Sequence, residues 1–369
     1  MHLLIISPLT KLSTPGTSNA VFTPVSSDLI FKGRPGDLRF GEWLHQREIS
    51  QSTQPSRSIA LFGCPDDTGV RLNRGRAGAQ EGPDSIRKAL YKMTCPRDSR
   101  WSSVGIFDLG NIQVEAEIQK THKNAEDASR SLAQEHAVIV LLGGGHDFAA
   151  PGISGWISGR QKTSGNLGFG VINIDPHLDV RELEDGVPNS GTAFRQLLES
   201  GHLTGSNFIQ FGCRENRNAP DHWNYCESQG TSLISLEKIT SQIASPPQQF
   251  GLQMNRLAKR VDALAVTLDL DCCHELPGTS AAPAIGFSIR ELCQMAYAAG
   301  CHSQVSYFEL AEVSPPWDPT GKTANAAAEI LYAFLSGKIS QGLGKTPLRQ
   351  IKKPNKTPKN IKNRNKRRV

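Results

Sequence analysis

The sequence lacks the long apolar stretches and the paired cysteines that characterise membrane proteins and disulfide-stabilised proteins. No segment of its 369 residues approaches the run of about 20 apolar residues that a membrane-spanning helix requires. Leu3–Ile6 is a brief apolar patch without a basic flank, too short to indicate a signal peptide. The eight cysteines form no Cys-x-x-Cys pair, and the adjacent Cys272 and Cys273 are poorly placed to crosslink a fold. We therefore expect a cytoplasmic protein with reduced thiols and no membrane association.

Acidic side chains are absent from the last part of the sequence. Lys345–Val369 contains eleven of the 41 Lys and Arg residues and no Asp or Glu. Without it the chain has 30 basic and 35 acidic residues, so the net charge of +6 comes from this tail. Its lysines, asparagines and prolines predict disorder. Such a tail permits nonspecific contact with nucleic acid or another polyanion, and a purely solubilising extension is the alternative.

The remaining sequence is organised as one unit. Strand and helix patterns alternate without a linker, which predicts a single α/β domain over residues 35–344. Residues 1–34 are rich in Ser, Thr and Pro, and we expect a loosely ordered lead-in there. Residues 345–369 form the basic tail described above.

Short apolar runs of the kind that form buried strands recur along this domain. Six of them are predicted strands: Ser58–Phe62, Ala137–Leu142, Val171–Ile174, Phe208–Phe211, Ala263–Leu268 and Val305–Leu310. Helical patterns separate them, at Gly82–Met93, Ala116–Glu135, Thr192–Ser200, Leu252–Val261, Ser288–Ala299 and Thr323–Ser336. The alternation predicts a three-layer α/β/α fold with a central, mainly parallel sheet.

Four of these runs end in residues that can bind metals. Gly143-Gly144-Gly145-His146, Asp175-Pro176-His177-Leu178-Asp179 and Asp269-Leu270-Asp271 each follow a run, and Glu312 follows the fourth. Ligands of open parallel sheets bind at the carboxyl ends of the strands, so these side chains are predicted to converge. The candidate ligands are His146, Asp175, His177, Asp179, Asp269 and Asp271.

Two imidazoles and four carboxylates form an oxygen-rich donor set. Such a set suits Mn²⁺ better than structural zinc, which favours closed sites rich in cysteine. With this many carboxylates two ions can share a ligand, and a two-metal site lowers the pKa of a bound water far below its bulk value of about 15.7. The sequence therefore predicts a hydrolase with two Mn²⁺ ions per subunit.

The same segments resemble the arginase/agmatinase family of ureohydrolases and, within it, the formimidoylglutamases of histidine breakdown. The resemblance extends over about Pro35–Leu335, and its motifs appear here as GGGHD, DPHLD and TLDLD. It implies an arginase-like fold, the six metal ligands named above and a homo-oligomer. It also implies that Glu312 faces the cationic carbon–nitrogen centre of the substrate, N-formimino-L-glutamate, which would be cleaved to L-glutamate and formamide.

The narrower resemblance depends on segments outside the metal motifs. Three segments look like formimidoylglutamase segments: Gly69–Gly78 with Glu81–Arg87, Asp179–Arg181 with Asn189–Arg195, and Pro277–Pro283. Ser190 stands where arginases and agmatinases usually carry a proton-transferring histidine. With no histidine there, Asp179 or a metal-held water is the candidate proton shuttle. Agmatinase- or arginase-like cleavage of another guanidino or amidino acid stays open, as does a pseudoenzyme with a nucleic-acid-binding tail.

Cations are expected near the mouth of the site, because the substrate carries two carboxylates and arginine binds carboxylates through two hydrogen bonds. Arg181 is the leading candidate, two residues beyond Asp179. Arg71, Arg74 and Arg76 follow on a Gly-rich loop, and Ser190 is a further substrate contact.

Two features depart from the family pattern. Pro176 replaces the usual alanine between two ligands, and the segment from Asp271 to Pro277 is shortened. Both are expected to bear on turnover more than on fold.

Overall fold

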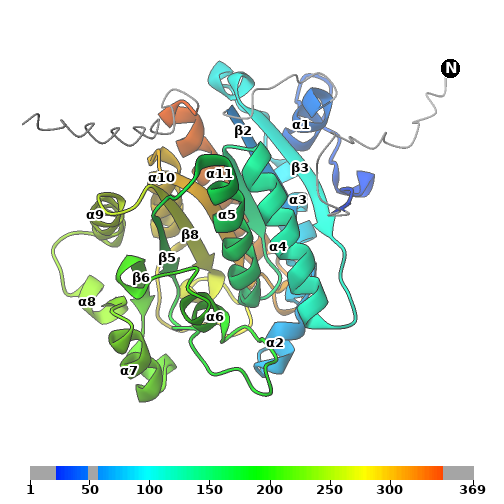
Figure 1. The fold of residues 1–369 in the computed structure, drawn as a ribbon. Coiled ribbons are helices and arrows are strands. Elements are labelled where there is room, and N and C mark those ends of the chain that lie inside the picture. Colours follow the sequence, from blue (N-terminus) through cyan, green and yellow to red (C-terminus); the bar gives the residue numbers. More distant parts are fainter. Residues whose placement is uncertain (1–21, 49–56, 344–369) are drawn as a thin grey trace, which may run out of the picture.

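The computed structural model describes residues 22–48 and 57–343, and a single mixed sheet runs through this part of the chain (Figure 1). Its strands lie in the order β1-β3-β2-β4-β9-β8-β5-β6-β7. Every neighbouring pair is parallel except β1 with β3. In chain order the strands are β1 (Phe22–Thr23), β2 (Ser58–Gly63), β3 (Gly105–Ile112), β4 (Val138–Leu142), β5 (Phe169–Ile174), β6 (Phe208–Cys213), β7 (Ser232–Ser235), β8 (Ala263–Asp269) and β9 (Val305–Ala311).

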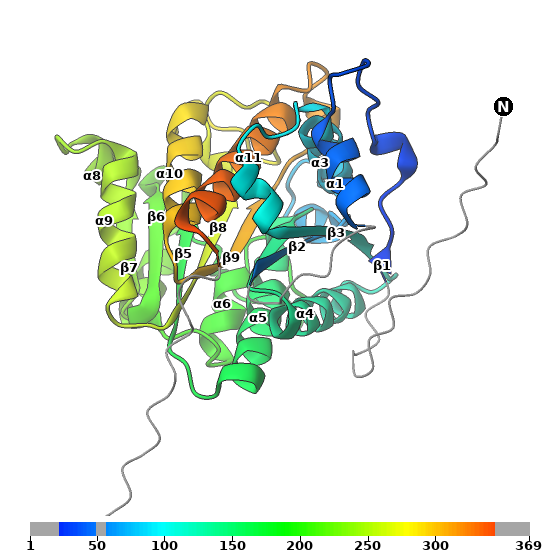
Figure 2. The same ribbon diagram turned by 90° about the horizontal axis from the view of Figure 1, so that it is seen from above.

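Helices cover both faces of the sheet, as the view in Figure 2 shows. One face packs against α1 (Phe40–Glu48), α3 (Gly82–Lys92), α9 (Pro246–Ala258), α10 (Ile289–Cys301) and α11 (Lys322–Gln341). The other packs against α4 (Ile118–Glu135), α5 (Ala149–Ser164) and α6 (Ala193–Glu199). The shorter α7 (Pro220–Ser228) and α8 (Leu236–Thr240) contact β7 at the sheet edge, and α2 (Thr68–Leu72) lies beside the loop after β4. The predicted three-layer α/β/α architecture is confirmed.

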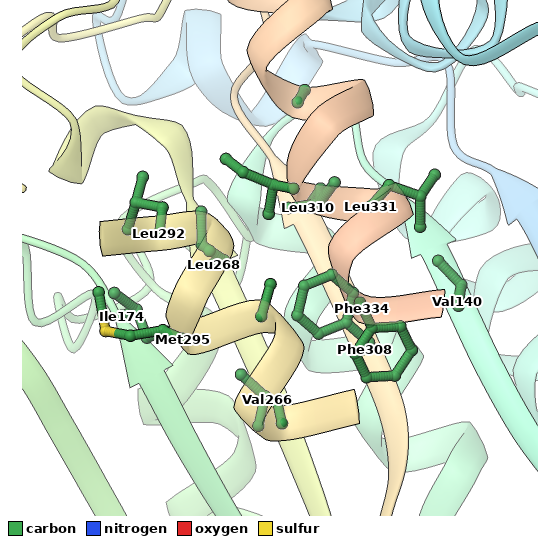
Figure 3. Packing of buried hydrophobic residues seen from close by; sticks show 14 of the residues in the cluster. Val140, Ile174, Val266, Leu268, Leu292, Met295, Phe308, Leu310, Leu331 and Phe334 are labelled. Atoms are coloured by element: carbon green, nitrogen blue, oxygen red, sulfur yellow. The ribbon is translucent and has the colours of Figure 1, made fainter. Parts of the chain in front are cut away.

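Alternate side chains of each buried strand pack into the two hydrophobic cores on opposite faces of the sheet. In β4, Val138, Val140 and Leu142 pack on the α10–α11 side, while Ile139 and Leu141 pack on the α4–α5 side. On the first side Phe308 of β9 stacks on Phe334 of α11 with 4.1 Å between ring centroids (Figure 3). A strand buried on both faces reads as a continuous apolar run, which is why these strands stand out in the sequence.

All six predicted strands and all six predicted helices are present, but some elements have no clear sequence signal. Helix α5 contains Pro151 and glycines that obscure its pattern. Gly155 and Gly159 are needed there because a Cβ on either would overlap backbone oxygens of α4. The close packing of the two helices, and not helix propensity, selects these residues.

The N-terminal lead-in is more ordered than expected over its later part. Phe22 and Thr23 pair with Ile112 and Asn111 of β3, so residues expected to be loose extend the sheet edge. The placement of the domain boundaries at residues 34/35 and 344/345 stays a prediction, and the basic tail 345–369 lies outside the described residues. Among the described residues, no helix has the length and apolarity to cross a membrane.

Helices α10 and α11 cross at closely approaching glycines. A Cβ on Gly337 would overlap the backbone oxygen of Tyr297 and lie 2.8 Å from the backbone nitrogen of Cys301. Replacing a helical glycine with alanine normally stabilises a helix by about 0.5–1 kcal/mol. In this crossing the backbone overlap must outweigh that gain.

We expect Gly337→Ala to lower the free energy of unfolding by about 1–3 kcal/mol, because overpacking forces the two helices apart. Gly251→Ala in α9 is the matched control, since a Cβ at Gly251 meets nothing within 4 Å and should stabilise the protein slightly. Urea unfolding of both variants measures the effect. A stability gain of equal size in both would contradict the close helix crossing.

Candidate metal centre

The predicted ligands meet because four strands lie side by side in the order β4-β9-β8-β5. His146 begins the short η5 (His146–Phe148) after β4, and Glu312 follows β9. Asp269 ends β8, and Asp175 directly follows β5. Their carboxyl ends form one edge of the sheet, and these four side chains are all buried there.

The ligand atoms fall into two sets that share one residue. His146, Asp175, Asp179 and Asp269 form the first set, and all are buried. His177, Asp269 and Asp271 form the second. Within each set the ligand atoms lie within 4.8 Å of one another. Asp269 belongs to both, so the structure contains two candidate cation sites that share one carboxylate.

His146 Nδ1 faces three carboxylate oxygens at once. The Oδ2 atoms of Asp175 and Asp179 each lie 3.0 Å from this nitrogen, and Oδ2 of Asp269 lies 3.4 Å away. One ring nitrogen carries a single proton or a single lone pair, so it cannot satisfy three acceptors. A divalent ion among these atoms would contact all four, and the donor set therefore fits a metal better than a hydrogen-bonded cluster.

The buried carboxylates repel one another, and this repulsion affects their pKa values. Burial, and then the charge of Asp271, hold the pKa of Asp269 well above its usual range. Burial and the charge of Asp175 raise the pKa of Asp179 to about 6. For Asp175 burial acts the same way, but hydrogen bonds with His146 and His177 hold its pKa below the usual range. Cations bound in the two sets would remove this repulsion.

Backbone and side-chain contacts orient the carboxylates. Asp175 accepts a hydrogen bond from the His177 backbone N–H at 2.7 Å. Asp271 accepts from the Ala281 N–H at 3.0 Å and from the Ser280 hydroxyl at 3.2 Å. The segment after the shortened stretch therefore holds Asp271 in the site.

Pro176 is accommodated as well. Its carbonyl accepts from the Arg214 N–H at 3.0 Å and from the Asn218 side chain at 2.9 Å. Asp175 and His177, its neighbours, still reach their ligand sets. The proline thus leaves the ligand residues in place although it lacks a backbone donor.

Three residues that line the cavity adopt the left-handed backbone conformation that side chains other than glycine rarely adopt, and the first is Arg74 with φ +63°. Asp179 has φ +49° and Glu312 has φ +68°. Such strain, of order 1–3 kcal/mol each, concentrates at functional sites, where packing fixes an otherwise unfavourable geometry. Asp179 and Glu312, whose carboxylates are buried, line the same cavity as Arg74.

Glu312 has one oxygen engaged and one free of hydrogen bonds. Its Oε1 accepts from the His146 backbone N–H at 2.8 Å, whereas its buried Oε2 has no hydrogen-bond partner among the described residues. Burial, and then the charges of Asp269 and Asp271, raise the pKa of Glu312 well above its usual range. A cationic group in the cavity would satisfy this carboxylate.

A cavity of about 550 Å³ opens above the ligands, with acidic side chains on its floor and arginines on its rim. Arg181 and Ser190 line it as predicted, and so does Arg74. Arg71 and Arg76 are not among the lining residues. Arg71 pairs with Asp67, while Arg76 donates to Pro277 O at 2.9 Å and stacks on Trp317. Both arginines are engaged within the loop structure, and their role as substrate contacts stays a prediction.

The sequence reasoning missed part of the cavity wall. Asn73 donates to the Ser190 hydroxyl at 3.0 Å, and Arg217 and His222 line the cavity from the segment after β6. The strand-end rule that found the other ligands, applied to β6, would have indicated this segment too. The sequence pattern also did not single out Glu309, which is buried on β9. Burial raises the pKa of Glu309 to about 7, and the charge of His146 opposes this rise.

A sequence profile of the Arginase family matches residues 57–337. The chain belongs to this family. The resemblance expected from the GGGHD, DPHLD and TLDLD motifs is thereby confirmed.

Individual relatives of the chain have names that are more specific than the family name. The chain is 28% identical to a formimidoylglutamase of Staphylococcus carnosus over 306 residues, which is 81% of this chain and 93% of that protein. It is 29% identical to one of Halalkalibacterium halodurans, over 78% and 89% of the two chains. Among solved structures, the Trypanosoma cruzi formiminoglutamase with Mn²⁺ matches with a TM-score of 0.72 and 26% identity, covering 83% of this chain and 99% of that one.

Because Asp269 belongs to both ligand sets, its replacement should weaken metal binding at both. We expect Asp269→Asn to abolish tight binding of both Mn²⁺ ions, because it removes charge from both sets. Asp271→Asn should leave one ion per chain, held by the set that contains His146. Equilibrium dialysis with elemental analysis gives the stoichiometry, and Glu227→Gln, an exposed change on α7, is the control. Equal losses in both aspartate variants would argue against two positions sharing Asp269.

Proposed function

We propose that this protein is a formimidoylglutamase, which hydrolyses N-formimino-L-glutamate to L-glutamate and formamide. The observation that carries the proposal is the charge arrangement of the cavity: carboxylates on its floor and guanidinium groups on its rim. A substrate with a cationic amidine at one end and carboxylates at the other fits this arrangement. Family membership and the names of the relatives support the same reaction.

The cofactor in this proposal is a pair of Mn²⁺ ions. His146, Asp175, Asp179 and Asp269 would hold one, and His177, Asp269 and Asp271 the other. Such ions supply Lewis acidity that makes water a nucleophile at neutral pH. The related Trypanosoma cruzi protein was solved with Mn²⁺, which supports this choice of metal.

The protein side chains position the substrate and manage its charge. Glu312 accepts the protonated amidine at its free Oε2 and holds the formimino carbon over the metal ligands. Arg181 binds a carboxylate at the rim, and Ser190, held by Asn73, completes that wall. Water adds to the formimino carbon, and the bond from that carbon to the glutamate nitrogen then breaks as the nitrogen gains a proton. Asp179, which lines the cavity, is the candidate proton donor.

The alternatives fit the cavity less well. Agmatine has no carboxylate to match Arg181, and Ser190 takes the place of the histidine used for guanidine hydrolysis. A pseudoenzyme is disfavoured because the six ligand residues come together in two metal-type sets. A cytoplasmic location, a homo-oligomer and a role in histidine breakdown belong to the proposal; the eight cysteines, all free thiols, agree with the first.

The proposal predicts metal-dependent release of formamide and glutamate from N-formimino-L-glutamate. The Mn²⁺-loaded protein should turn over this substrate and give no urea from arginine or agmatine. Chelation should abolish the activity, and added Mn²⁺ should restore it. Urea release from either guanidine, without formamide from the first substrate, would replace the proposal by the guanidine alternative.

We predict that Arg181 contributes mainly to substrate binding and less to the chemical step. Arg181→Met should raise KM for N-formimino-L-glutamate at least about tenfold with a smaller change in kcat, because a charge-assisted contact common to the bound and transition states is lost. Steady-state kinetics separate the two parameters. Arg256→Met, which removes an exposed arginine of α9 outside the cavity, should match the wild type. An unchanged KM in Arg181→Met would exclude the carboxylate contact.

A further inference from the structure

Three arginines on the cavity rim have guanidinium groups that no carboxylate satisfies. Arg74, Arg181 and Arg217 line the cavity, and none forms an ion pair within the described part of the chain. They come from three separate segments: the turn after α2, the loop after Asp179, and η7 (Glu215–Arg217) after β6. Glu215 also lines the rim but does not pair with Arg217.

Neighbouring arginines outside the cavity behave differently. Arg195 bonds to Glu182 at 2.9 Å and to Glu199 at 2.8 Å. Arg214 contacts Glu237 at 3.4 Å and donates to Ile285 O at 3.2 Å. Arg195 and Arg214 thus have carboxylate partners, whereas Arg74, Arg181 and Arg217 have none among the described residues. Their position in the cavity lining leaves these three available to an anionic ligand.

Arg217 is carried by a segment fixed to the metal-ligand loop. The next residue, Asn218, accepts from the Leu178 N–H at 2.8 Å and donates to Pro176 O at 2.9 Å. Arg214 N–H also donates to Pro176 O, at 3.0 Å. These bonds fix the η7 backbone relative to the segment that supplies Asp175, His177 and Asp179. The backbone of Arg217 is therefore held in a fixed position relative to the candidate metal ligands.

Arg181 lies near the helix that follows the Arg217 segment. Its aliphatic part packs against Gly191, where a Cβ would lie 2.7 Å from Arg181 Cδ, and its charge acts on His222 of α7, the helix that follows the Arg217 segment. Arg181 follows the candidate metal ligand Asp179 by only two residues, whereas Arg217 is far from every candidate ligand in the sequence. Arg217 is connected to the ligand segment only through hydrogen bonds of its neighbours, so we assign Arg181 the inner and Arg217 the outer position.

We infer that Arg217 binds the side-chain carboxylate of the substrate while Arg181 binds its α-carboxylate, so that Arg217 selects a dicarboxylate. This rests on the proposed function. In N-formimino-L-glutamate the α-carboxylate is bonded to the carbon next to the amidine nitrogen, so it stays near the floor. The side-chain carboxylate lies two methylenes further out and reaches the outer cation. A monocarboxylate amidine would leave Arg217 without a partner.

The test uses paired substrates, N-formimino-L-glutamate and N-formimino-L-glutamine, which differ only in the side-chain carboxylate. In the wild type kcat/KM should favour the first by about 100-fold, the discrimination expected when a charged contact is lost. Arg217→Met should reduce that preference about tenfold or more by slowing the first substrate alone. Arg217→Lys should recover part of it, because an ammonium keeps the charge and loses the two-hydrogen-bond geometry.

Two further variants make the assignment specific. Arg181→Met should slow both substrates by similar factors, since both retain the α-carboxylate, and Arg256→Met should slow neither. Binding of the products L-glutamate and L-glutamine, measured by calorimetry, should show the same pattern without turnover. The exposed position of Arg217 predicts unchanged thermal unfolding of Arg217→Met, so any loss reflects binding.

Several outcomes would overturn the assignment. Equal slowing of both substrates by Arg217→Met would make Arg217 a general electrostatic contributor. Loss of the preference in Arg74→Met, with Arg217→Met unaffected, would move the contact to the opposite segment. Either result leaves the proposed function intact if the wild type releases formamide, whereas absence of formamide from both substrates would remove the proposed function itself.

Discussion

The mutual repulsion of buried carboxylates at one edge of the sheet is the constraint on which the rest of the structure depends. Asp175, Asp179, Asp269 and Asp271 are buried within two small sets that contain only two imidazoles, and Glu312 stands beside them. Burial alone makes such a cluster unfavourable. Two divalent cations would offset that charge, and in the proposed function the remaining carboxylate, Glu312, would attract a cationic substrate. On this proposal, metal binding and substrate orientation depend on one arrangement of charge.

The scaffold keeps this arrangement fixed through polar contacts inside an otherwise apolar sheet. Asn173 of β5 donates to Gln210 of β6 at 2.9 Å and accepts from Thr267 of β8 at 2.8 Å, with all three side chains fully buried. Gln210 in turn donates to Leu178 O at 2.6 Å, in the ligand segment. A fully satisfied buried network of this kind specifies geometry, so the ligand loop is held by strands on either side of it.

The sequence predicted the parts of the site that directly follow buried strands, because a run such as Val171–Ile174 has a strong apolar signal and its carboxyl end must lie at the binding edge. It did not predict features that depend on packing. Helix α5 was obscured by glycines chosen for contact with α4, and Arg71 and Arg76 were assigned to substrate although tertiary contacts engage them elsewhere. The strand-end rule indicates the segment after β6 but not Arg217 itself, because an exposed arginine in a loop has no periodic signal. Its lack of a carboxylate partner among the described residues is visible only in the structure.

In the proposed metal centre, two cations occupy adjacent positions that share Asp269. Electron paramagnetic resonance of the Mn²⁺-loaded protein tests it most directly, because ions about 3.5–4 Å apart are magnetically coupled and isolated ions are not. The account predicts a coupled binuclear spectrum at two equivalents of Mn²⁺, replaced by an uncoupled mononuclear one in Asp271→Asn. A mononuclear spectrum in the wild type at saturating Mn²⁺ would contradict it.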